Sequence, residues 1–166
     1  MFGPLINKHA LAMGLRPDIV AAVIIQESNG EPFAARYEDA FYQALLANKK
    51  RQELAGFVPY PTPTLATEKR LRATSLGLMQ VMGDSARWIG KVTANYLTIL
   101  CEPDIGIEVG CKVLKFYLDK ERGDYHRALS RYNSGRPDSQ RGMRYAEEVL
   151  GRVSRGEHLR FFSGQD

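Results

Sequence analysis

One acidic side chain stands at the end of an apolar helical pattern in the stretch 21–30. Read as a helix, this stretch puts Val20, Val23, Ile24 and Glu27 on one face. An apolar setting disfavours the charged form of a carboxyl group and raises its pKa toward neutrality. Such a carboxylic acid can donate a proton as a general acid. The alternative is a Glu at a helix end that turns into water or pairs with an Arg.

Other polar side chains stand in places where a ligand can reach them. Gln80 is surrounded by apolar residues in the segment 75–82, so its amide needs either a backbone partner or a polar ligand. Tyr132 and Asn133 come at the end of a helical pattern, just before a glycine, where Asn133 can equally be a helix cap. Tyr145 lies in the last helical pattern and can equally belong to the core.

The totals restrict the class of protein. A chain of 166 residues with 44% hydrophobic and 25% charged residues is typical of a single globular domain, here 1–166. The net charge of +4 favours anionic partners such as cell-wall polymer, nucleic acid or lipid head groups. No basic stripe interleaved with aromatic residues supports nucleic-acid binding. No apolar run approaches the roughly 18 residues of a membrane span.

Metal-ligating residues are few and scattered. The two cysteines, Cys101 and Cys111, and the three histidines, His9, His126 and His158, do not have the spacing of metal ligands. We therefore expect no metal and no other cofactor. The sequence allows a bridge between the two cysteines but does not imply one, and two free, buried thiols are the preferred interpretation.

The elements that must position these side chains are mainly helical, and no alternating strand pattern is visible. Proline, acidic and glycine residues mark most helix ends. The helix predicted over 103–122 is the longest, and its apolar stripe, which includes Val109, Val113 and Phe116, is typical of a central buried helix. Helices are predicted over 4–13, 17–28, 39–48, 75–82, 85–90, 103–122, 124–135 and 142–155.

The connecting segments have distinct compositions. Residues 56–66 contain three prolines and are expected to form an exposed loop. Residues 49–51 are basic and are interpreted as a solvated helix end. Residues 91–102 are expected to be a connection or partial helix, and the tail 156–166 is expected to fray.

Four segments, taken in order, resemble the soluble lytic transglycosylase (SLT) domain of glycoside hydrolase family 23. They are Glu27-Ser28, Gly77-Leu-Met-Gln80, Ala128-Leu-Ser-Arg-Tyr-Asn-Ser-Gly135 and Tyr145, and the match covers about 17–155. The resemblance implies the lysozyme-like fold that this family shares with goose-type lysozymes. That fold is mainly α (α+β), with about seven to eight helices around a central buried helix and a groove for a glycan strand.

The resemblance also implies a reaction. A lytic transglycosylase cleaves the β-1,4 bond between N-acetylmuramic acid and N-acetylglucosamine in peptidoglycan. Glu27 would protonate the glycosidic oxygen and then accept a proton from the sugar's own 6-hydroxyl, which closes on C1 as a 1,6-anhydro end. A dry acid suits this mechanism.

The same resemblance assigns roles around the acid. Ser28 would polarise the site, Met79 and Gln80 would line the saccharide groove, and Tyr145 would close its wall. Tyr132 and Asn133 would position the scissile sugar or Glu27. The implied substrate-binding residues are Ser28, Met79, Gln80, Tyr132, Asn133 and Tyr145.

Two features depart from the family's pattern. Glu27 and Gln80 are 53 positions apart, which is longer than usual, and the excess falls within 31–74. Arg131 precedes the Tyr-Asn pair, where a small or apolar residue is common. The insertion and the absence of a signal peptide pattern resemble a bacteriophage version. We therefore expect a monomer that acts on the cell wall in the periplasm, associated with a virion or released from the host cytoplasm.

Two other functions stay open from the sequence. A goose-type-like muramidase would need a second carboxylate, roughly 6.5–9.5 Å from the first, to activate water. Glu38 and Asp39 are the candidates, although an ion pair with Arg36 or a helix cap explains them equally well. The other function is a glycan-binding or phage structural module that does not cut its ligand.

Overall fold

The computed structural model describes residues 2–47, 64–93 and 96–163. Within them the chain forms eight α-helices, three short strands and two 3₁₀ helices, in agreement with the expected helix-rich fold. The helices are α1 (Gly3–Ala12), α2 (Pro17–Ser28), α3 (Asp39–Ala47), α5 (Leu65–Arg72), α6 (Gly83–Trp88), α7 (Pro103–Lys120), α8 (Tyr125–Ser134) and α9 (Gln140–Ser154). The strands are β1 (Ala35–Tyr37), β2 (Thr74–Leu76) and β3 (Val81–Met82), and the 3₁₀ helices are η1 (Leu97–Cys101) and η2 (Glu157–Phe161).

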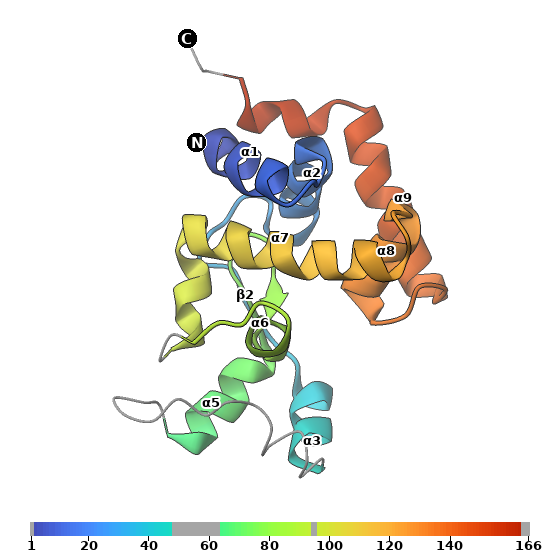
Figure 1. Ribbon diagram of the computed structural model, residues 1–166. Coiled ribbons are helices and arrows are strands. Elements are labelled where there is room, and N and C mark those ends of the chain that lie inside the picture. The colour runs from blue at the N-terminus through green and yellow to red at the C-terminus, as the bar shows by residue number, and fades with distance from the viewer. Residues whose placement is uncertain (1, 48–63, 94–95, 164–166) are drawn as a thin grey trace.

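Helix α7 runs through the middle of the molecule (Figure 1). Proline at its first position and Asp104 in its first turn favour a helix start there. Its buried face includes Ile107, Cys111 and Leu114, which helical spacing places together. The predicted central helix is thus confirmed, but Phe116 is 38% exposed and the expected stripe is wrong at that residue. The larger buried surface follows residues 107, 111 and 114 because α1, α6 and α8 all pack on α7.

Helix α2 occupies the bounds predicted from the sequence. All residues from Ile19 to Ile25 are buried, so the helix is surrounded by other elements rather than lying on the surface. Asn29, with φ +54°, adopts the left-handed conformation that ends the helix. The last turn of α2, which carries Glu27, therefore has a fixed position.

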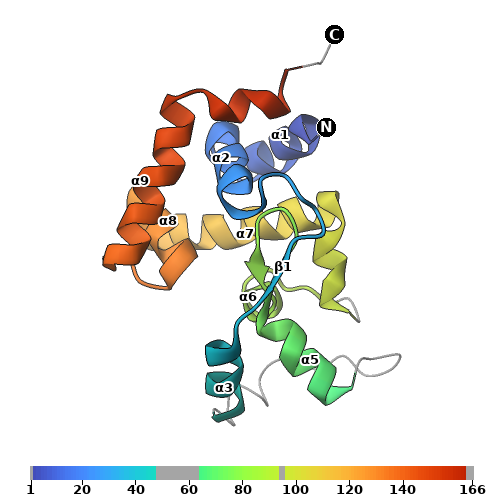
Figure 2. The same cartoon turned by 180° about the vertical axis from the view of Figure 1, so that it is seen from behind.

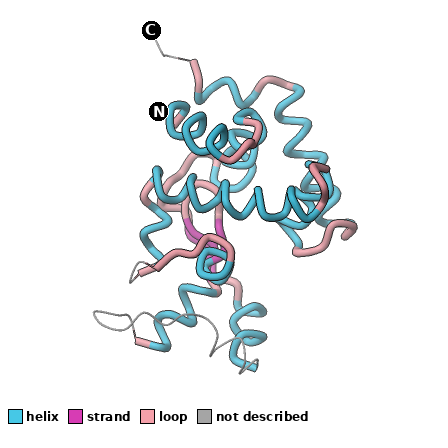
Figure 3. The backbone as a smooth tube through the Cα atoms, in the orientation of Figure 1, coloured by secondary structure: helices cyan, strands magenta, loops and turns pink. Residues whose placement is uncertain are grey.

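The three strands form a small antiparallel sheet with the order β1-β2-β3, drawn in magenta in Figure 3. The helix predicted over 75–82 is wrong, because these residues form a β-hairpin instead. Its turn needs positive φ at Gly77 (+76°) and Gln80 (+44°), which ends any helix. A side chain on Gly77 would lie 2.1 Å from the carbonyl oxygen of Leu100, so the turn admits only glycine. A short apolar run does not distinguish helix from strand.

Helices α5 and α6 are joined by buried ion pairs. The carboxylate of Glu68 accepts from Arg72 at 2.9 Å and from Arg87 at 2.8 Å, and all three side chains are at most 5% exposed. Helix α6 begins and ends two residues before the predicted bounds of 85–90, and a side chain on Gly83 would lie 2.2 Å from the carbonyl oxygen of Leu71. The ion pairs hold α5 against the part of the chain that carries the hairpin.

The proline-rich segment is only partly described. Residues 56–63 and the basic run 49–51 lie outside the described residues. The predicted loop is wrong for 64–66, since Thr64 caps α5 and Leu65 and Ala66 belong to that helix. Helix α3 begins at Asp39 as predicted.

The C-terminal segment packs against the N-terminus. In η2, Phe161 is buried and its ring lies 6.2 Å from that of Phe2. A side chain on Gly3 would meet the carbonyl oxygen of Phe161 at 2.4 Å. The expectation of a frayed tail is wrong for 157–161, because these residues close the core beside α1. Cys101 and Cys111 are free thiols, and only Cys111 is fully buried.

Candidate active site

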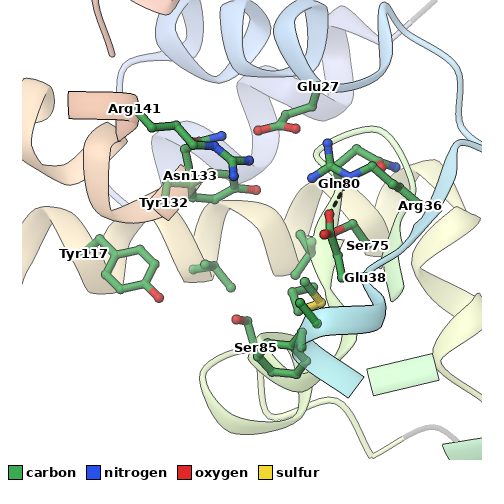
Figure 4. Close-up of a pocket in the computed structure, with 15 residues that line it drawn as sticks. Glu27, Arg36, Glu38, Ser75, Gln80, Ser85, Tyr117, Tyr132, Asn133 and Arg141 are labelled. Carbon is green, nitrogen blue, oxygen red and sulfur yellow. Dashed lines mark ion pairs between the residues drawn. The ribbon is translucent and has the colours of Figure 1, made fainter. Parts of the chain in front are cut away.

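A groove of about 440 Å³ opens between the end of α2, the small sheet and helix α8. Figure 4 shows Glu27 at its edge, with Arg36 and Glu38 from the β1 side facing Tyr132 and Asn133. The back view in Figure 2 shows how β1 and α9 lie on either side of α2. Residues far apart in the sequence therefore meet around one carboxyl group.

Glu27 has the environment of a proton donor. Burial raises the pKa of its carboxyl group above the ordinary value. The hydrogen bond from Tyr145 and the charges of Arg36 and Arg141 act in the opposite direction but do not cancel this effect. Within the described residues Glu27 forms no ion pair, which separates it from the solvated or Arg-paired alternative. The carboxyl group is therefore partly dry and inclined to keep its proton.

Tyr145 fixes the orientation of that carboxyl group. Its hydroxyl donates a hydrogen bond of 2.7 Å to Oε1 of Glu27, across 118 positions of sequence. The ring is 6% exposed, and burial together with the nearby Glu27 charge raises the phenol pKa well above its usual value. Tyr145 thus stays a donor and contacts the acid directly, behind the groove surface.

Ser28 connects the end of α2 to the hairpin. Its hydroxyl donates to the carbonyl oxygen of Leu78 at 2.8 Å and accepts from the amide of Gly30 at 3.2 Å. Both partners are backbone groups. This geometry supports a positioning role, in which Ser28 holds the hairpin turn beside Glu27.

Gln80 and Met79 behave differently, although they are neighbours. Gln80 lines the groove, and its Nε2 donates to the carbonyl oxygens of Ala34 at 2.8 Å and Gly77 at 3.1 Å. Met79 is fully buried and packs against Gly110, which has no room for a side chain beside the sulfur. The expectation that the Met79 side chain lines the groove is corrected, because its position in the hairpin turns it into the core.

Tyr132 and Asn133 line the groove from the last turn of α8. The Tyr132 hydroxyl donates to the carbonyl oxygen of Met79 at 2.7 Å, which joins α8 to the hairpin. The Oδ1 atom of Asn133 is buried and has no hydrogen-bond partner among the described residues. A buried acceptor without a partner is costly, and a ligand in the groove would satisfy it.

Sequence reasoning did not identify Arg141, and it treated Arg36 only as a partner for a nearby acid. Both line the groove. Arg36 forms an ion pair of 2.7 Å with Glu38, as one interpretation of that acid expected. Arg141 is the second residue of α9, and a basic residue in the first turn of a helix is the signal that would have found it.

Two predicted features lie away from the groove. Asp39 begins α3 and is not part of the groove lining, whereas Glu38 is. Arg131, which departs from the resembled pattern, pairs with Glu121 at 2.5 Å and so fastens α8 to the end of α7.

In the part of the chain that the structure describes, no three metal-ligating side chains cluster and no helix is long and apolar enough to span a membrane.

Comparison with protein-family models matches residues 4–153 to the transglycosylase SLT domain. The matched range runs from the second residue of α1 to the second-last residue of α9 and includes every residue of the groove described above. No curated protein and no solved structure matches the chain.

Proposed function

The chain belongs to the transglycosylase SLT family, and we propose that Glu27 carries out the family's reaction, first as acid and then as base. Membership makes the protein a peptidoglycan lytic transglycosylase. The observation that carries the proposal is the buried carboxyl group of Glu27, with its raised pKa, at the edge of the groove.

The proposed reaction needs one carboxyl group and no water. Protonated Glu27 gives its proton to the β-1,4 oxygen between N-acetylmuramic acid and N-acetylglucosamine as the bond from that oxygen to C1 breaks. The resulting carboxylate takes the proton of the muramoyl 6-hydroxyl, and O6 bonds to C1 as a 1,6-anhydro ring. The 2-acetamido group assists at C1. Glu27 ends the cycle protonated, which a raised pKa favours.

The neighbouring side chains have supporting roles in this proposal. Tyr145 holds Oε1, so the other carboxyl oxygen is left to face the substrate. Ser28 and Tyr132 fix the hairpin, and the unpartnered Oδ1 of Asn133 accepts a hydrogen bond from the sugar chain. Because the substrate is a cell-wall polymer, we further propose that the enzyme acts at the wall.

Analysis of the products tests the mechanism. Purified enzyme is incubated with peptidoglycan, beside the Glu27→Gln variant, and the soluble muropeptides are weighed by mass spectrometry. Anhydro products are about 18 Da lighter than hydrolysed ones, by the mass of one water. We expect anhydro products from the native enzyme and none from the variant. Ordinary reducing ends from the native enzyme would contradict the proposal.

One observation favours a second candidate, hydrolysis. Glu38 lines the same groove as Glu27 and could activate water there. Its ion pair with Arg36 supports a structural role instead. A hydrolase would lose its reducing-end products on Glu38→Gln, whereas the transglycosylase retains its anhydro products, so the same mass analysis distinguishes the two.

A further inference from the structure

Arg141 is a charged group in the groove that the proposed reaction does not use. Its side chain is exposed and lines the groove. Among the residues that the structure describes, none accepts a hydrogen bond or forms an ion pair with its guanidinium group. Arg36, on the β1 side, is already paired with Glu38. Arg141 therefore brings a positive charge to the groove that another molecule can neutralise.

The position of Arg141 in α9 also gives no structural reason for its positive charge. It is the second residue of α9, whose first turn contains no acidic residue. The N-terminal end of a helix carries partial positive charge, so a basic side chain there is unfavourable. Ser139 already caps the helix by accepting from the amide of Gly142 at 3.1 Å. Arg141 thus does not stabilise the start of α9.

Asn133 supplies a second, independent sign of a ligand in the same groove. Its Oδ1 atom is a buried acceptor without a partner in the described part of the chain. Figure 4 shows Arg141 and Asn133 on the same side of the groove, across from Arg36 and Glu38. An acceptor and a cationic donor on one wall suit a group that contains both an amide N–H and a carboxylate.

Peptidoglycan contains such groups, and neutral glycans do not. The muramoyl residue carries a lactyl ether, and a peptide stem is attached to that lactyl group. A stem provides amide N–H groups and carboxylates, and a lactyl group freed of its stem ends in a carboxylate. An oligomer of N-acetylglucosamine has no carboxylate for Arg141 to bind.

We propose that Arg141 binds a carboxylate of the muramoyl substituent and so determines the specificity of the enzyme for carboxylate-bearing strands. This inference rests on the proposed function and deepens it. A guanidinium group can hold a carboxylate through two parallel hydrogen bonds. The stem and the free lactyl group share this chemistry, and the test distinguishes them.

The test compares strands that differ only in their carboxyl groups. The substrates are soluble glycan fragments with intact stems, the same fragments with carboxyl groups converted to amides, and fragments whose stems have been removed. For each, kcat and KM are measured with the native enzyme and with Arg141→Gln, Arg141→Lys and Arg144→Gln. Arg144 is a matched control, because it is exposed on α9 but does not line the groove.

We expect the native enzyme to prefer intact over amidated fragments about tenfold in kcat/KM, mainly through KM. Arg141→Gln removes the preference, Arg141→Lys restores part of it, and Arg144→Gln keeps it. On stem-free fragments, whose lactyl groups end in a free carboxylate, a kcat/KM that still depends on Arg141 shows that the lactyl carboxylate can also bind there, and one that does not depend on Arg141 assigns the site to the stem. Equal losses on intact and amidated fragments in Arg141→Gln would overturn the proposal, because Arg141 would then act through Glu27 or the fold.

Binding separates this inference from the proposed reaction. The Glu27→Gln protein binds the fragments without consuming them, and calorimetry compares intact with amidated fragments with and without Arg141→Gln. A preference that depends on Arg141 supports the inference even if product analysis rejects the anhydro mechanism. Equal affinity for both kinds of fragment rejects the inference even if anhydro products form.

Discussion

At the scale of single residues, the proposed chemistry depends on the contact between Glu27 and Tyr145. The charged groups around Glu27 are Arg36 on β1 and Arg141 on α9, and the two tyrosines that face it are Tyr145 and Tyr132. Burial raises the Glu27 pKa, while the Tyr145 hydrogen bond lowers it. Each of these opposing effects gives a separate prediction.

Tyr145→Phe is expected to move the alkaline limb of the pH profile of kcat/KM to higher pH. Loss of the hydroxyl removes a hydrogen bond that favours the carboxylate, so Glu27 keeps its proton to higher pH. We also expect kcat to fall about tenfold, because the carboxyl group loses its orientation. Tyr125→Phe is the control, since that hydroxyl accepts from the amide of Arg16 far from Glu27 along the chain. An alkaline limb that stays in place in Tyr145→Phe would contradict the prediction.

Glu27→Gln is expected to be more stable than the native protein as the pH rises. A raised pKa in the folded state means that the stability contributed by Glu27 is complete below its unfolded value and is lost as the pH rises through the folded value. Glutamine has no charge to bury, so the difference in unfolding free energy should grow from acid to neutral pH. Urea unfolding of both proteins over this range measures it. A difference that does not change with pH would show that the carboxyl group is well solvated.

At the scale of elements, the β-hairpin between β2 and β3 connects the groove to the core. Gly77 turns it at φ +76°, and the carbonyl of Leu100 lies where a side chain would be. Ser28 and Tyr132 both donate to backbone carbonyls of the turn. The turn is thus held from α2, α8 and η1 together.

Gly77→Ala is expected to destabilise the protein by about 2–4 kcal/mol and to lower activity, because the methyl group displaces either the turn or Leu100. Gly123→Ala is the matched control. Gly123 also has a positive φ, of +88°, but nothing lies within 4 Å of an added side chain. Its cost should be only the backbone strain, about 1 kcal/mol. Chemical unfolding measures both, and equal costs would remove the close contact as the cause.

Local signals explain which elements the sequence could predict. Helices α2, α7 and α8 have a proline or a capping aspartate at the start and, in α2 and α8, a left-handed residue at the end, so their bounds were predicted closely. The sheet was missed because β1 pairs with β2 across the long 31–74 segment, and such a pairing leaves no local pattern. The acid and its aromatic partners were found through residue type and order. The burial of Met79 and the exposure of Arg141 depend on tertiary packing, which the sequence does not show.

At the scale of the whole molecule, a buried ion cluster stabilises the region farthest from the chain ends. Glu68 pairs with both Arg72 and Arg87, and the buried Asp84 brings a second carboxylate 3.7 Å from Arg72. The two guanidinium groups hold the pKa of Glu68 below its usual value, against the effect of burial. Removing one member leaves charges buried without their counter-ion.

Glu68→Gln is expected to lower the unfolding free energy by about 3–5 kcal/mol at neutral pH. Because the folded pKa of Glu68 is lowered, its contribution is present above the unfolded value and is lost as the pH falls through the folded value. The deficit of the variant should therefore shrink in acid. Glu108→Gln is the control, since Glu108 pairs with Lys112 on the surface at the same i, i+4 spacing and should cost at most about 1 kcal/mol. Equal effects of the two variants would contradict the role of burial.

The hydrogen bond between Tyr145 and Glu27 also has a consequence for the order of synthesis. The two residues are 118 positions apart, so the acid leaves the ribosome long before its partner. Translation at about 5–20 residues per second leaves an interval of several seconds or more between them. During that interval the growing chain contains Glu27 but not the helix that orients it. Under the proposed reaction, the nascent chain therefore carries its acid without the hydrogen bond that orients it, and gains the complete site only when α9 has been made.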